Sequence, residues 1–107
     1  MEGMEAVCFE IISTVGAAKS AYIGAIEKAK TGDYEEAAAL IDQGNEMYQE
    51  GHTAHVDMLQ KDAAGEQKAE FSLLLMHAED QMMMAETFRI VAEDFIDVYK
   101  RLTSCAN

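Results

Sequence analysis

The sequence predicts an all-α protein, folded as an antiparallel up-down-up three-helix bundle. Ala, Met, Glu and Leu dominate the 107-residue chain and Pro is absent, a composition that favours helices. Apolar residues recur at spacings of three and four along three long segments. Connections of only a few residues join these segments and place successive helices antiparallel. A chain of this length is expected to form one domain over residues 1–107.

The first helix is predicted over about residues 2–30. Its apolar stripe has the spacing of a coiled-coil seam and consists of Cys8, Ile11, Val15, Ala18, Tyr22, Ala25 and Ala29. Lys28 and Lys30 suit the negative end of the helix dipole. Gly32 is expected to take the left-handed conformation that ends the helix.

The second helix is predicted from its cap at Asp33 to about Ala63. Glu36 follows Asp33 by three residues, which is the pattern of a capping box. The expected buried face consists of Tyr34, Ala37, Ile41, Gly44, Tyr48, Gly51, His55 and Met58. Each glycine inside a helix costs about 1 kcal/mol relative to Ala. We therefore expect Gly44 and Gly51 to permit a close approach by a neighbouring helix.

A short polar break at residues 63–67 precedes the third helix, which is predicted from about Lys68 to about Leu102 with a small frayed tail. One apolar series consists of Phe71, Leu74, Ala78, Gln81, Ala85, Phe88, Ala92, Phe95, Tyr99 and Leu102. On another side, a stripe about 60° wide holds Leu73, His77, Asp80, Met84 and Val91. A three-helix bundle needs one seam per helix, so the second face is expected to hold a homo-oligomer.

The charge and composition exclude several classes of function. A formal net charge of −12 argues against nucleic acid or an anionic membrane as a partner. No apolar run is expected to approach the about 20 residues that span a bilayer, and the acidic N-terminus does not resemble a signal peptide. We therefore expect a cytoplasmic protein without direct membrane insertion. Cys8 and Cys105 would lie about 40 Å apart at opposite ends of the bundle, and both are expected to be reduced thiols.

Among the three histidines, His77 is the candidate catalytic residue. A neutral imidazole is a competent nucleophile towards phosphorus, and Asp80 shares its helix face one turn away. Asp80 carboxylates from several copies, meeting in an oligomer interface, would need protons or a divalent cation. The alternatives are that His77 is an ordinary core histidine and that Asp80 is a structural hydrogen-bond acceptor. His52 and His55 lack the Glu-x-x-His pattern of di-metal bundles and are expected to form structural hydrogen bonds.

Three segments carry a resemblance to a known family, and they are TGDYEEA (31–37), EGHTAH (50–55) and SLLLMHAEDQMM (72–83). With them the chain resembles the lactose/cellobiose (β-glucoside) type of enzyme IIA component of the bacterial phosphoenolpyruvate-dependent sugar phosphotransferase system. The likeness covers nearly the whole chain. Within it the His-Ala-x-Asp core is the most specific part.

The resemblance implies a homotrimer that carries phosphate. The histidine matching His77 would receive a phosphoryl group on Nε2 from the histidine-containing phosphocarrier protein and pass it to the cognate enzyme IIB. The imported β-linked disaccharide, of the cellobiose or lactose type, would then be phosphorylated through the membrane component IIC. The Asp matching Asp80 would join its two symmetry copies around one Mg²⁺ per trimer. The sequence departs from the family beside this site, where Glu79 and Gln81 replace the usual Gln and His.

Two other interpretations stay open on the sequence. A histidine phosphotransfer domain of a signalling pathway is also a helical bundle with one phosphorylated histidine. Such domains typically carry a Lys and a Gly shortly after that histidine, where this chain has acidic, amide and Met side chains. A non-catalytic helical oligomer would take up no phosphate at all.

Overall fold

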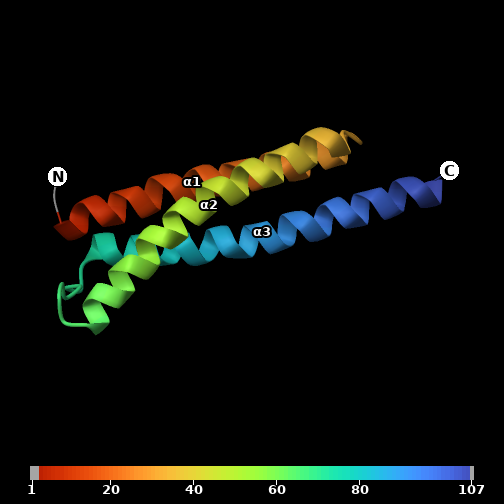
Figure 1. Cartoon of the computed structure of the whole chain (residues 1–107). Coiled ribbons are helices and arrows are strands. Elements are labelled where there is room, and N and C mark those ends of the chain that lie inside the picture. Colours follow the sequence, from red (N-terminus) through yellow and green to blue (C-terminus); the bar gives the residue numbers. More distant parts are fainter. Residues whose placement is uncertain (1–2, 107) are drawn as a thin grey trace.

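The computed structural model describes residues 3–106 and confirms the all-α prediction. Three helices, α1 (Gly3–Lys30), α2 (Tyr34–Ala63) and α3 (Leu73–Ala106), form an elongated bundle of 59 × 21 × 20 Å. Figure 1 shows the up-down-up course of the chain, with the beginning of α1 and the end of α3 at opposite ends of the bundle.

Helix α1 packs along both α2 and α3 and supplies most of the core. All seven residues of its predicted stripe are buried, with exposed fractions of 1% or less. Towards one end of the bundle Ile11 and Val15 pack with Met58 of α2. Towards the other end Tyr22 packs with Ile41 of α2. The prediction of the α1 stripe is therefore confirmed, and the buried face also includes Thr14 and Ala21.

The turn between α1 and α2 has the predicted glycine and cap. Gly32 has a φ of 82°, which is the left-handed conformation that a glycine adopts without steric cost. The amide of Asp33 donates to the carbonyl of Lys28 at 3.0 Å, and this bond closes the end of α1. Asp33 Oδ1 then accepts a hydrogen bond from the amide of Glu36 at 3.2 Å. The same aspartate thus begins α2 directly after α1 ends.

Side chains of α1 lie directly against both glycines within α2, which confirms the predicted close approach by a neighbouring helix. A Cβ atom on Gly44 would stand 2.5 Å from the ring of Tyr22. A Cβ atom on Gly51 would stand 2.6 Å from Thr14 Oγ1 and 2.7 Å from Val15 Cγ1. Any larger residue would therefore push the two helices apart.

The predicted bounds of the third helix are wrong at both ends. Helix α3 starts at Leu73 rather than Lys68, since Ser72 Oγ accepts from the amide of Leu75 at 3.1 Å and caps the helix there. The residues before it stay irregular, held where the amide of Ala69 donates to Asp62 Oδ1 at 2.8 Å. At the other end the helix continues to Ala106, beyond the frayed tail expected after Leu102.

The first apolar series of the third helix is buried only in its middle. Ala78, Ala85 and Ala92 are fully buried, whereas Phe71 before the helix is 84% exposed and Leu102 is 59% exposed. Figure 1 shows the last turns of α3 extending past the turn between α1 and α2, and Tyr34 at the start of α2 forms hydrogen bonds there with the Tyr99 carbonyl and the Thr103 hydroxyl. Phe95, further along the same series, is 45% exposed. Met82 is buried although it belongs to neither series, because it packs in the cluster that includes Ile11 of α1 and Met58 of α2.

One expectation about membranes needs correction. Within residues 3–106, α1 is long and apolar enough by length and composition to cross a bilayer, although no such run was expected. The stripe that includes Ile11, Val15 and Tyr22 is buried against the other two helices. A core helix of a bundle meets the same criterion of length and composition, so this feature of α1 is weak as an indication of a membrane span.

Candidate functional site

The two candidate residues of α3 lie on its uncovered side, in the first three turns of the helix. His77 and Asp80 are both exposed, as are Leu73 and Met84 of the same predicted stripe. The second apolar face therefore exists and is left open by the three helices of one chain.

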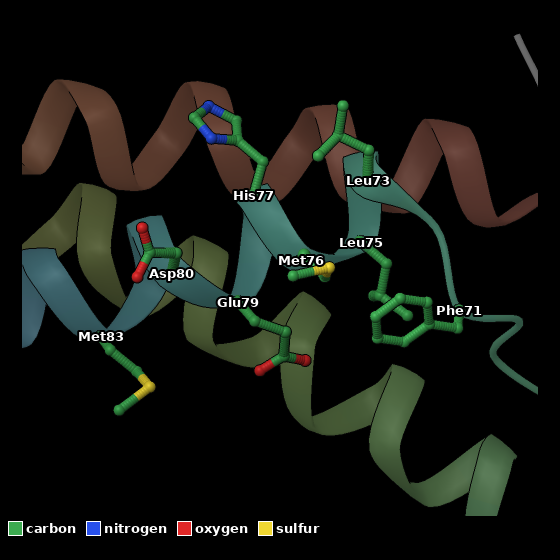
Figure 2. A pocket seen from close by; sticks show the side chains of 8 residues that line it. All are labelled: Phe71, Leu73, Leu75, Met76, His77, Glu79, Asp80 and Met83. Atoms are coloured by element: carbon green, nitrogen blue, oxygen red, sulfur yellow. The ribbon is translucent and has the colours of Figure 1, made fainter.

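His77 lines an open cavity of ≈ 630 Å³ at the start of α3. Figure 2 shows the ring projecting from α3, with the carboxylate of Asp80 one turn further along the same helix. Other side chains that line the cavity are Glu79, Phe71, Met76 and Met83. The surroundings of the imidazole are thus mostly apolar and flexible, with two acidic groups, and the ring is accessible to a phosphoryl donor.

His55 and Glu79 form a pair that sequence reasoning missed. Nε2 of His55 in α2 lies 2.8 Å from Oε1 of Glu79 in α3, and the carboxylate accepts the hydrogen bond. The His55 side chain is 16% exposed and that of Glu79 is 39% exposed. The prediction of a structural hydrogen bond for His55 is confirmed. Its partner is 24 residues away in sequence and becomes visible only in the folded chain.

His52 is held in another way. Its ring stacks on that of Tyr48, with centroids 5.8 Å apart and planes 15° from parallel. The guanidinium of Arg89 from α3 lies 5.5 Å from the centroid of the same tyrosine ring. This arrangement of a histidine, a tyrosine and an arginine links α2 to α3 through stacking and a cation–π contact. The structural role expected for His52 is therefore fulfilled by stacking rather than by hydrogen bonding.

The two cysteines are free, as predicted. Cys8 is buried, and burial raises the pKa of its thiol, with further contributions from the carboxylates of Glu79 and Glu5. A thiol that stays protonated is a poor nucleophile. Cys8 therefore does not compete with His77 as the reactive group. Cys105 is exposed near the end of α3.

The described part of a single chain has no group of side chains that could bind the predicted metal ion. In the described part of the chain, no three His, Cys, Asp or Glu side chains come together in a way that suits a metal ion. Asp80 offers a single exposed carboxylate, and a hard divalent cation takes six or more oxygen ligands. The residues present therefore fit a metal only where Asp80 side chains from several copies meet.

Comparisons with known proteins support the resemblance. Residues 6–100 match the family model described as "PTS system, Lactose/Cellobiose specific IIA subunit". The lichenan-specific phosphotransferase enzyme IIA component of Bacillus subtilis (strain 168) is 36% identical over 102 residues, covering 95% of this chain and 92% of that protein.

Solved structures agree with the sequence relatives. The cellobiose-specific enzyme IIA from Bacillus anthracis superposes with a TM-score of 0.91 at 35% identity, covering 97% of this chain and 95% of that chain. The IIA(Chitobiose) protein of Escherichia coli, solved in complex with HPr, gives a TM-score of 0.81 at 30% identity over 96% of this chain and 99% of that chain. The chain belongs to the lactose/cellobiose-specific IIA subunit family of the sugar phosphotransferase system, and as such it is a phosphotransferase component.

Proposed function

We propose that His77 accepts a phosphoryl group from the histidine-containing phosphocarrier protein HPr and passes it to the cognate enzyme IIB. The observation that carries this proposal is the exposed imidazole of His77 in an open cavity, whereas His52 and His55 are engaged by other side chains. The related IIA(Chitobiose) protein was solved in complex with HPr, which supports the identity of the donor.

The chemistry needs one nitrogen of a neutral His77 ring. Its lone pair forms a new N–P bond while the N–P bond of the donor phosphohistidine breaks, and the donor imidazole leaves with the electron pair of that bond. Nε2 is the nitrogen that we assign to this role, following the family pattern. In the second transfer the N–P bond of His77 breaks, the His77 imidazole leaves with its electron pair, and the phosphorus forms a new bond to the nucleophile of enzyme IIB.

We also propose that three chains assemble through the uncovered side of α3. Leu73 is 83% exposed, Met83 67% and Ile90 51%, which is unusual for side chains of this size on a monomer. In such a homotrimer the cavity at His77 would border a neighbouring copy. The three Asp80 carboxylates would approach one another, and one Mg²⁺ shared between them would offset their repulsion.

The names of the relatives support a proposal for the class of sugar. Lichenan, lactose and cellobiose name the specificities of proteins that match over more than nine tenths of this chain. We propose that residues 1–107 act as a single cytoplasmic domain in the uptake of a β-linked disaccharide of the cellobiose or lactose type through enzymes IIB and IIC.

The decisive experiment is phosphate transfer from labelled phosphoenolpyruvate through enzyme I and HPr. The wild-type chain should acquire acid-labile label within seconds, and His77→Ala should acquire none while keeping its helicity. His52→Ala is the matched control and should label normally. Retained label in His77→Ala would contradict the assignment. No label in the folded wild type would favour a non-catalytic oligomer or a signalling phosphotransfer domain instead.

A further inference from the structure

The pair formed by His55 and Glu79 lies directly beside the proposed phosphorylation site. Glu79 is two residues from His77 and lines the same cavity. In Figure 2 the two side chains leave α3 in different directions, with Glu79 turned towards α2 and His77 turned away from it. The Glu79 carboxylate is therefore both near the reacting ring and held to one side of it.

An unrestrained carboxylate at this position would oppose the reaction. A phosphoryl group on histidine carries close to two negative charges. A glutamate side chain that was free to turn into the cavity would repel the incoming phosphoryl group and the phosphorylated product. The hydrogen bond of 2.8 Å from His55 opposes that rotation, because it fixes the carboxylate at the surface of α2.

The other titratable groups near Glu79, Cys8 and Glu5 of α1, do not restrain its carboxylate. The thiol of Cys8 in α1 is close enough for the Glu79 carboxylate to raise its pKa, and it stays neutral. Glu5 acts on the same thiol with a negative charge and would repel Glu79. In residues 3–106, His55 is the residue whose side chain forms a hydrogen bond to this carboxylate. Its Nε2–H serves as donor in the neutral ring as well as in the imidazolium.

We propose that His55 is a positioning residue for phosphoryl transfer, because its ring holds the Glu79 carboxylate against α2 and out of the path of the phosphoryl group on His77. This inference rests on the proposed function of His77. It predicts that His55 matters for transfer only while Glu79 carries a negative charge.

The test is a double-mutant cycle on the rate of phosphoryl transfer from phosphorylated HPr. His55→Ala in the wild-type background should lower the second-order rate constant about three- to tenfold, as expected for one released charge near the surface. In a Glu79→Gln background the same His55→Ala change should alter the rate by less than about twofold. His55→Gln, whose amide keeps a donor, should retain most of the wild-type rate, and His52→Ala is the matched control on α2.

Several outcomes would overturn the inference. A His55→Ala protein as fast as wild type would show that Glu79 needs no restraint. An equal slowing in both backgrounds would show that His55 acts through packing rather than through the Glu79 charge, and circular dichroism and thermal unfolding of each variant identify loss of fold. If the wild type labels at His77 while the cycle shows no coupling, only this inference fails. If the wild type does not label, the proposed function fails first.

Discussion

At the scale of single residues, Tyr22 shows how much the core depends on one polar atom. Its side chain is fully buried, and its hydroxyl donates to Asn45 Oδ1 at 2.8 Å. Burial raises the pKa of this phenol to about 12, because the anion would lose its hydration, while Arg89 partly opposes the shift. The neutral phenol is therefore part of what keeps α1 and α2 together.

This burial predicts an alkaline loss of stability. A folded pKa above the unfolded value of 10.0 contributes stability that is complete below pH 10 and is lost as pH rises through about 12. We expect the free energy of unfolding to fall by up to about 2 kcal/mol over that window, measured by urea unfolding at successive pH values. Tyr22→Phe should cost about 1 kcal/mol at pH 8 for the lost hydrogen bond but show a smaller alkaline decline. An identical alkaline decline in the wild type and in Tyr22→Phe would show that titratable groups other than Tyr22 cause the loss of stability.

At the scale of elements, the packing of α1 on α2 depends on the absence of side chains at two glycines. Helix propensity alone favours replacing any helical glycine with Ala, by about 0.5–1 kcal/mol. The distances at Gly51 oppose that gain, because the Cβ atom would collide with Thr14 and Val15 of the facing helix. Gly16 in α1 has no neighbouring atom within 4 Å of such a Cβ atom.

Gly51→Ala and Gly16→Ala should therefore have opposite effects on stability. We expect Gly51→Ala to lower the free energy of unfolding by about 1–3 kcal/mol, since overpacking outweighs the gain in helix propensity. Gly16→Ala should raise it by about 0.5–1 kcal/mol. Urea unfolding monitored by circular dichroism measures both. Stabilisation by both substitutions would mean that the two helices separate at little cost.

At the scale of the whole molecule, the two sides of α3 have different roles: one side packs in the core, and the other carries the candidate site. Ala78, Ala85 and Ala92 face α1 and α2, and their small side chains allow close packing. The opposite side carries His77, Asp80 and a row of exposed apolar side chains. Transfer of each Leu or Met side chain out of water stabilises an interface by about 1.5–3 kcal/mol, which is enough to overcome screened repulsion between acidic chains.

The exposed apolar side of α3 predicts a homotrimer, and the position of Asp80 on that side predicts that the stability of the trimer depends on a bound metal ion. Sedimentation at micromolar concentration should give about three times the chain mass of 11.8 kDa. Chelator should lower the thermal stability of the wild-type trimer, while Asp80→Leu should form a trimer that is insensitive to chelator, because an apolar cluster replaces buried like charges. A concentration-independent monomer would contradict the assembly. If chelator does not change the stability of the wild type and the Asp80→Leu protein does not assemble, the result would indicate that Asp80 is a structural hydrogen-bond acceptor.

The parts of this fold that follow from local pattern were predictable from the sequence. The stripe of α1, the cap at Asp33, the turn at Gly32 and the close approach at Gly51 each depend on residues a few positions apart or on the cost of glycine in a helix. The exposed histidine on the second face of α3 follows from the same periodicity. The family likeness rests on short segments of sequence and needed no coordinates.

Other features were decided only by the tertiary structure, because they depend on where the helices cross and end. Helix α3 begins at Leu73 since Ser72 caps it, although the apolar pattern continues further back. Met82 is buried because the core cluster around Ala78 and Ala85 extends to the side chain next to the predicted series. The hydrogen bond between His55 and Glu79 joins residues 24 positions apart, and no local pattern encodes which side chains of α2 and α3 meet.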